Sequence, residues 1–207
     1  ISVAEASQVM PSSDYLGSNS LYSYFGRIIY DFDNKYSVTA SMRADGSSKF
    51  ADGKKWGYFP AASASWKLSN ESFMQSTRDY VDNIRLKIGY GETGNQQIPN
   101  YRYGVVLNTS QTGIGSAFLA SNYANIDLQW EESKQTNIGI DFTLFNSRLG
   151  ATIEVYKKES EKFLYQLPLS LMLTGGDSYY GGIAAPYSNI GVMQNTGMDI
   201  TLTYSTK

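Results

Sequence analysis

The chain has 207 residues, with 17 Lys and Arg against 19 Asp and Glu, so its formal net charge is only −2. This balance gives no basis for a nucleic-acid surface. The sequence contains no Cys and no His, which excludes disulfides, thiol nucleophiles and Ser-His-Asp triads, together with the commonest metal ligand. It also lacks the run of about 18 apolar residues that a transmembrane helix needs.

The first two predicted strands form a hairpin. Residues 21–32 and residues 36–44 both alternate between two kinds of side chain, and a period of two is typical of β-strands. Residues 33–35, Asp-Asn-Lys, predict the tight turn that joins them. The second strand alternates most regularly, with an apolar side that consists of Tyr36, Val38, Ala40 and Met42.

A long polar loop is expected over residues 45–58, followed by a strand over residues 59–68. The apolar side of that strand carries Pro60, Ala62, Ala64, Trp66 and Leu68. Asn70 is suited to cap a short helix near residues 70–82, and the helix dipole favours Glu71 in its first turn. An irregular turn is the alternative for this segment.

Further strands are predicted at residues 84–91, 133–144, 149–155 and 195–204. Between them lie an irregular stretch at residues 92–132, a tight turn at residues 146–148 and a Gly- and Tyr-rich excursion at residues 159–193. The connections between the strands therefore run short, long, medium, long, short, long.

This alternation predicts the architecture. An up-and-down barrel in an outer membrane has short turns at one end and long loops at the other, whereas a β-sandwich has no reason to place every long connection at one end. The second face of the strands carries mid-strand charges, which tolerate a watery lumen better than a sandwich core. A sandwich accommodates them only if this face is its solvent face, and that alternative stays open here. These charges are Arg27, Arg85, Lys87, Asp141, Glu154 and Asp199.

The apolar face carries aromatic residues near strand ends: Phe32, Tyr36, Trp66, Tyr90 and Tyr204. Such residues can form the aromatic girdles of a membrane barrel. Ordinary cross-strand packing accounts for them equally well, and only clustering at two heights distinguishes the two interpretations.

Several blocks, in this order along the chain, resemble the barrel of the SusC/RagA family of TonB-dependent outer-membrane transporters. They are residues 43–50 (RADGSSKF), 56–60 (WGYFP), 65–73 (SWKLSNESF), 86–91 (LKIGYG), 93–96 (TGNQ), 130–132 (WEE), 135–141 (QTNIGID) and 195–199 (NTGMD). The resemblance covers residues 21–204. It predicts an all-β fold, a partial antiparallel up-and-down transmembrane β-barrel of about 7–8 strands of a larger barrel, with long outer loops and one short helix near residues 70–82.

The resemblance also implies a function and a place in the cell. It implies import of nutrients, usually glycan oligosaccharides or peptides, across the outer membrane of a Gram-negative bacterium. The implied partners are a SusD-like surface lipoprotein, the TonB complex, outer-membrane lipid and the substrate. Residues 1–207 are interpreted as an incomplete internal segment of the barrel domain, without the signal, the plug, the TonB-contacting N-terminal part and the closing strands.

No catalytic pattern emerges, and we predict neither an enzyme, nor a cofactor, nor a metal site. The segment 175–182 is glycine-rich but lacks the Lys-Ser/Thr of a phosphate-binding loop. Glu131 and Glu132 are neighbours on a strand, so their side chains point to opposite faces and cannot act as a carboxylate pair. Glu159 and Glu161 are better explained as solvated charges.

The outer loops hold residues suited to binding sugars or peptides, because aromatic rings cover apolar faces while amide and guanidinium groups fix orientation. The candidates for contact with substrate or with the partner lipoprotein are Trp56, Tyr58, Asn95, Gln96, Tyr101, Arg102, Tyr179 and Tyr180. The alternative function is a secreted or surface β-sandwich that binds carbohydrate without transport.

Overall fold

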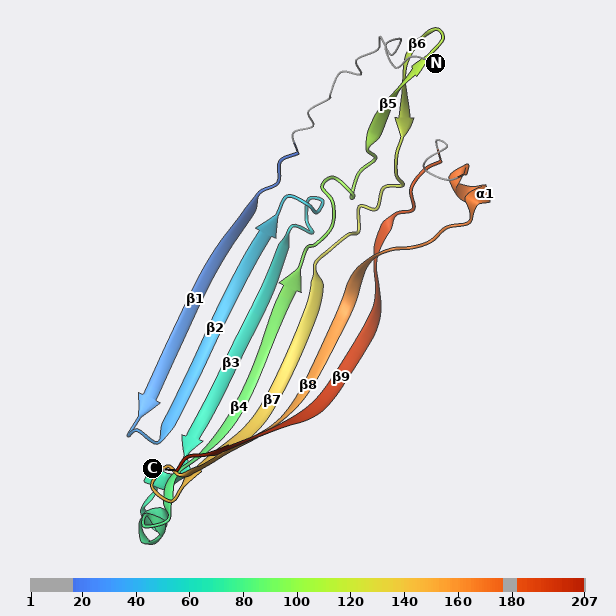
Figure 1. The fold of residues 1–207 in the computed structure, drawn as a ribbon. Helices are drawn as coiled ribbons and strands as arrows, with labels where there is room; N and C mark the ends of the chain where they lie inside the picture. The colour runs from blue at the N-terminus through green and yellow to red at the C-terminus, as the bar shows by residue number, and fades with distance from the viewer. Residues whose placement is uncertain (1–16, 177–181, 207) are drawn as a thin grey trace, which may run out of the picture.

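The computed structural model describes residues 17–176 and 182–206, and its main element is one seven-stranded antiparallel sheet (Figure 1). The strands of this sheet are β1 (Leu21–Phe32), β2 (Tyr36–Ser47), β3 (Trp56–Lys67), β4 (Val81–Asn95), β7 (Glu131–Leu144), β8 (Leu149–Gln166) and β9 (Tyr187–Tyr204). A separate hairpin consists of β5 (Leu107–Thr112) and β6 (Gly115–Ala120). The helical segments are η2 (Leu68–Asn70), η3 (Ser72–Thr77) and α1 (Leu171–Thr174). None of the helices in the described part of the chain is long and apolar enough to cross a membrane.

The strands of the large sheet lie in the order β1-β2-β3-β4-β7-β8-β9, so each pairs with the next one along the chain. The connections after β2, β4 and β8 meet at one end, here called the loop end, where the β5–β6 hairpin and α1 also lie (Figure 1). The connections 33–35, 68–80 and 145–148 lie at the opposite end, the turn end. The predicted up-and-down order and its alternation of connections are confirmed.

The turn between β1 and β2 consists of residues whose backbone preferences suit a tight turn. Asp33 and Asn34 both adopt a positive φ of 50°, a left-handed conformation that Asp and Asn tolerate better than most residues. The backbone N–H of Lys35 closes the turn by donating a 3.0 Å hydrogen bond to the carbonyl oxygen of Phe32.

The strand register places the apolar positions of all seven strands on the same face of the sheet. One row across the sheet runs Phe32, Tyr36, Trp66, Leu86, Ile140, Ile153 and Ile200. The next row runs Asp31, Ser37, Ser65, Lys87, Gly139, Glu154 and Asp199. Because side chains alternate between the two faces of a strand, one face of the sheet is apolar and the other is small and polar, as predicted.

The apolar face is not covered by any other element of the described chain. Ile28, Ile88 and Leu202 on it are 74%, 51% and 73% exposed. In a sandwich, this face would be buried against a second sheet. The only other sheet among the described residues is the β5–β6 hairpin, which projects beyond the loop end (Figure 1). The β-sandwich alternative is therefore wrong for this chain.

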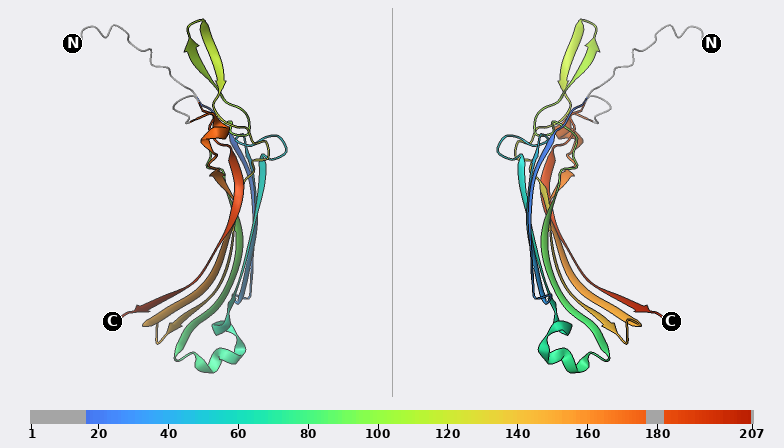
Figure 2. Two further views of the ribbon diagram at one scale, coloured as in Figure 1. Left: turned by 90° about the vertical axis from the view of Figure 1, so that its right-hand side faces the viewer. Right: turned by 90° about the vertical axis from the view of Figure 1, so that its left-hand side faces the viewer.

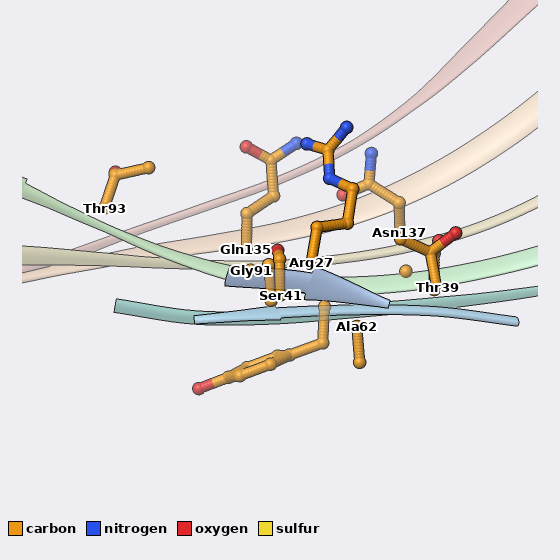
Figure 3. A pocket seen from close by; sticks show the side chains of 12 residues that line it. Arg27, Thr39, Ser41, Ala62, Gly91, Thr93, Gln135 and Asn137 are labelled. Atoms are coloured by element: carbon orange, nitrogen blue, oxygen red, sulfur yellow. The ribbon is translucent and has the colours of Figure 1, made fainter. Parts of the chain in front are cut away.

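The sheet is strongly curved, and the turn ends of β8 and β9 swing away from those of β1 and β2 (Figure 2). In Figure 3, Arg27, Gln135 and Asn137 point to the side toward which β8 and β9 curve, and Ala62 points to the other side. The polar face is thus the concave face and the apolar face is the convex face, as in the wall of a barrel.

Aromatic side chains gather at two heights on the convex face of β1 to β3. At the turn end, Tyr36 stacks on Phe32 and on Trp66, with ring centroids 6.5 and 6.1 Å apart. At the loop end, Tyr24 stacks on Trp56 at 5.9 Å. On β3, Trp56 and Trp66 are ten residues apart, roughly 33 Å along the strand, and a tilt of about 40° reduces this to the roughly 25 Å apolar band of outer-membrane barrels. The girdle interpretation is the better one for Phe32, Tyr36 and Trp66.

Several details differ from the predictions, and one is the β5–β6 hairpin, which lies within the stretch 92–132 that was expected to be irregular. The segment after β3 is helical but consists of two 3₁₀ turns, η2 and η3, and Asn70 does not cap either of them. Its side-chain amide donates instead to the carbonyl oxygen of Asn34, 2.8 Å away in the first hairpin turn. The strands are also longer than predicted at the loop end, because β2 pairs with β1 as far as Ser47 and β3 pairs with β2 from Trp56 onward.

Candidate functional site

The concave face forms a shallow depression in the middle of the sheet, with a volume of about 430 Å³. Its floor is made of small residues, among them Ser41, Ala61, Ser63, Gly89 and Gly91. Arg27, Gln135 and Asn137 stand around it (Figure 3). Small residues at paired positions of β3 and β4 leave room for another molecule to approach the backbone closely. The arrangement suits contact with polar ligands or polypeptide.

Toward the turn end the concave face carries an ionic network on β4, β7 and β8. Lys87 Nζ lies 2.9 Å from Asp141 Oδ1 and 3.8 Å from Glu154 Oε2. Asn137 Nδ2 donates to Glu154 at 2.6 Å, and Thr152 Oγ1 donates to Asp141 at 3.1 Å. The mid-strand charges predicted to share a face do so here. Ion pairs this accessible stabilise the sheet little, so their main consequence is a hydrophilic wall.

The carboxylates that invited an acid–base interpretation are engaged elsewhere. Glu132 pairs with Lys162 at 2.7 Å and Glu161 with Lys134 at 3.0 Å. Glu131 accepts a hydrogen bond from the backbone N–H of Leu164 at 3.2 Å. Within the described ranges, no group of three or more Asp or Glu residues is placed to hold a metal ion.

A small hydrophobic core lies at the loop end of the sheet. It consists of Phe50, Phe59, Ile98, Leu128 and Trp130, which are the buried hydrophobic residues of the described chain. Trp130 packs against Phe50 and Phe59 with ring centroids 5.4 and 5.5 Å apart. A Cβ atom on Gly94 would overlap the Phe59 ring, so this glycine is needed for the close approach of β4.

Hydrogen bonds join the loops around this core into one body. Trp130 Nε1 donates to the carbonyl oxygen of Lys55 at 2.9 Å. Asn189 Oδ1 accepts from the backbone N–H of Gln129, while Asn189 Nδ2 donates to the carbonyl oxygen of the same residue at 2.8 Å. Asn125 Nδ2 donates to the carbonyl oxygen of Tyr187 at 2.8 Å. In the loop 48–55, a hydrogen bond from Lys55 lowers the pKa of the Asp52 carboxyl.

Four of the predicted contact residues lie at the end of β4 and in the segment that follows it. Asn95 ends β4 and accepts a hydrogen bond from the backbone N–H of Gln97. Tyr101 donates its hydroxyl proton to the carbonyl oxygen of Ser18 at 3.3 Å. The Gln96 Oε1 and Arg102 Nε atoms are buried and have no hydrogen-bond partner among the described residues.

The other four predicted residues lie apart from this segment. Trp56 and Tyr58 are strand residues of β3 rather than loop residues, and they share the convex face with Trp66. Tyr179 and Tyr180 lie outside the described residues. The sequence-based prediction also missed Asn122, Asn125 and Asn189, which tie the loops together. An isolated Asn in a polar loop has no local signal that distinguishes it from a solvated one.

A curved antiparallel wall with an apolar convex face, long loops at one end and short turns at the other defines the class of outer-membrane β-barrels. The family described as "TonB dependent receptor-like, beta-barrel" matches residues 4–205. The chain therefore belongs to the TonB-dependent receptor β-barrel family, whose members lie in the outer membrane of Gram-negative bacteria. The predicted family and location are confirmed. The loop end is accordingly the extracellular end of the wall and the turn end is the periplasmic end.

Individual relatives agree with this assignment. The chain is 34% identical over 186 residues to TonB-dependent receptor P39 of Formosa agariphila, covering 89% of this chain and 17% of that protein. It is 30% identical over 196 residues to TonB-dependent receptor SusC of Bacteroides thetaiotaomicron, covering 91% and 19%. The solved structure of the RagAB peptide transporter superposes with a TM-score of 0.81 at 29% identity, covering 91% and 20%. The chain thus spans about a fifth of the length of the proteins it matches.

Proposed function

We propose that this chain is part of the wall of a TonB-dependent importer that takes up nutrients, as oligosaccharides or peptides, through its lumen. The observation that carries the proposal is the division between the two faces, with exposed apolar residues on the convex face and small, polar and ion-paired residues on the concave face. Such a division suits a wall between lipid and an aqueous passage. We propose no enzymatic step, since the carboxylates of β7 and β8 serve ion pairs and hydrogen bonds.

The extracellular end is the proposed contact surface for a SusD-like surface lipoprotein. The short helix α1 exposes Leu171, Met172 and Leu173 there, and β6 exposes Phe118. Exposed apolar groups on loops are typical of protein interfaces. Coupling to the TonB complex is assigned to an N-terminal part of the protein outside these 207 residues. The name of the RagAB peptide transporter supports peptides as one of the two substrate classes.

Substrate contact is proposed for Asn95, Gln96, Tyr101 and Arg102. A buried polar atom without a partner costs about 1–3 kcal/mol, and a polar ligand that reaches Gln96 Oε1 or Arg102 Nε removes that cost. Trp56 and Tyr58 lie on the convex face, so of the two predicted roles only contact with the partner lipoprotein at the outer rim is proposed for them. Tyr179 and Tyr180 keep the same proposed role on the basis of sequence alone.

The test uses cells that lack the receptor, complemented with the full-length gene. We expect saturable uptake of a labelled peptide pool or a labelled oligosaccharide pool, lost when the proton-motive force is dissipated. The variant Arg102→Ala is expected to reduce uptake by about tenfold, the equivalent of one lost polar contact of ~1.4 kcal/mol. Lys54→Ala, at an exposed position of the loop 48–55, is the matched control and should transport normally. Complemented cells that take up neither pool would refute the proposal.

A further inference from the structure

Two cations on the concave face, Lys67 and Arg85, have no anionic partner among the described residues. Lys67 ends β3, and it lies directly opposite Arg85 of β4 in the strand register. Like charges at directly opposed positions destabilise a strand pair. Neither side chain forms an ion pair or a hydrogen bond with the described chain, although Lys87, two residues further along β4, contacts two carboxylates.

The nearby carboxylates do not neutralise this pair. Asp141 of β7 lies opposite Arg85 in the register, but its Oδ1 atom is engaged by Lys87 and Thr152. Asp33 and Glu71 both pair with Lys35, at 3.1 and 3.4 Å. The positive charge of Lys67 and Arg85 is therefore left over after the local ion pairs have formed.

A depression of about 290 Å³ opens beside the two cations. It is lined by both of them and by Ser37, Ser65 and Lys35, and Asp31 of β1 is its only carboxylate. Asp31 forms no ion pair with either cation in the described structure; β2 lies between its strand and that of Lys67, and both β2 and β3 lie between its strand and that of Arg85. The depression thus combines short side chains, which leave space, with two cationic side chains, Lys67 and Arg85, that have no anionic partner among the described residues.

The position of the depression restricts what fills it. Lys67 N donates to the carbonyl oxygen of Lys35 at 2.7 Å, so the pair sits beside the first hairpin turn, at the periplasmic end. Barrels of about 22 strands, the size typical of outer-membrane transporters, have a plugged lumen. A concave face at this depth therefore meets folded polypeptide rather than open water.

We propose that Lys67 and Arg85 form a docking site for carboxylate side chains of a polypeptide segment that packs inside the barrel at its periplasmic end. The guanidinium of Arg85 is suited to bind a carboxylate in a bidentate manner, while Lys67 adds a compact point charge. The inference rests on the proposed function only in that the chain is part of a closed receptor barrel. It adds the chemistry and the location of one contact between wall and interior.

The test measures access to the depression in the full-length receptor in detergent. Ser65→Cys places a thiol in its lining, and alkylation at position 65 by a charged maleimide is quantified by peptide mass spectrometry. We compare this receptor with the same receptor carrying Lys67→Gln and Arg85→Gln. If the docking site exists, alkylation at position 65 is at least about tenfold faster in the double variant. This corresponds to a loss of ~1.4 kcal/mol from the binding of the segment that covers the thiol. The control Arg78→Gln, an exposed cation of the connection 68–80, leaves the rate within about twofold.

Salt provides a second arm that needs no charge substitution. About 1 M NaCl screens ion pairs beyond ~3 Å, so it should accelerate alkylation at position 65 without the substitutions and change it little in the double variant. Equal rates with and without the two substitutions would overturn the proposal. Protection that appears only after a peptide pool is added would also overturn it, since the carboxylates would then come from substrate. Neither outcome depends on uptake, so failure here is distinct from failure of the proposed import function.

Discussion

The hydroxyl of Tyr36 donates a 2.7 Å hydrogen bond to Glu71 Oε1, and the indole N–H of Trp66 donates a 3.0 Å hydrogen bond to the same oxygen. Lys35 Nζ lies 3.4 Å from the other carboxylate oxygen. Glu71 therefore attaches the periplasmic connection 68–80 to the aromatic row on the convex face. The Tyr36 hydroxyl and the Trp66 indole N–H thus point toward the level of the lipid headgroups, as the polar groups of amphipathic aromatic residues do at a membrane interface.

The first prediction concerns pH. Hydrogen bonds from Tyr36 and Trp66, and the charge of Lys35, lower the pKa of Glu71 from its ordinary value of 4.5. A lowered pKa in the folded state contributes stability above the unfolded value, and this stability is lost as the pH falls through the folded-state value. The melting temperature of the full-length receptor should therefore fall as the pH drops below about 4.5, and Glu71→Gln should flatten that fall. The control Asp79→Asn, in the same connection, should leave the fall in melting temperature unchanged. If the melting temperatures of Glu71→Gln and the parent protein fall equally steeply with pH, Glu71 does not have this role.

The second prediction concerns the extracellular core. Trp130 is 5% exposed, and its ring packs on Phe50 and Phe59, so Trp130→Ala should cost about 3–5 kcal/mol. The loss should appear as faster amide hydrogen exchange in the loop 48–55, because the Trp130 indole N–H also bonds Lys55. Trp56→Ala is the matched control, since Trp56 is 46% exposed. Similar exchange in the two variants would show that the core does not hold the loop.

The third prediction uses the glycine that faces Phe59. Gly94→Ala places a methyl group where the Phe59 ring lies, and overpacking of this kind costs about 1–3 kcal/mol. The urea midpoint of unfolding of the receptor should fall accordingly. Gly113→Ala is the control, because a Cβ atom there meets no heavy atom within 4 Å. A midpoint unchanged by Gly94→Ala would mean that β3 and β4 are less closely apposed at this point than the structure has them.

The fourth prediction concerns the two faces of the wall. Spin labels at Val38, Met42 and Ile140 of the full-length receptor in lipid bilayers should be relaxed by oxygen, which concentrates in lipid. Labels at Thr39 and Ser41, on the alternate positions of β2, should instead respond to a water-soluble nickel reagent or to neither reagent. Each strand position is its neighbour's control, since successive side chains point to opposite faces. Oxygen relaxation at Thr39 as strong as at Val38 would contradict the assignment of the faces.

The local pattern predicted most of the strand architecture. A period of two in residues 36–44 and 133–144 identifies strands whatever they pair with, because it reflects only which side chains share a face. Asp33 and Asn34 likewise predicted a turn, since their tolerance of positive φ is a property of the residues themselves. The alternation of short and long connections then predicted an up-and-down order, in which each strand pairs with the next, and the order of strands in the sheet confirms it.

Tertiary structure decided what depends on partners far away in the chain. The polar stretch at residues 45–58 is loop-like in composition, yet Trp56 and Tyr58 join β3 because β2 offers backbone hydrogen bonds at the matching positions. Pairing across the sheet overrides local preference. The core of Phe50, Ile98 and Trp130, the clamp on Glu71 and the unpaired charges of Lys67 and Arg85 likewise arise only from register. Period two alone tells which residues share a face, whereas the contacts across strands tell which of them meet.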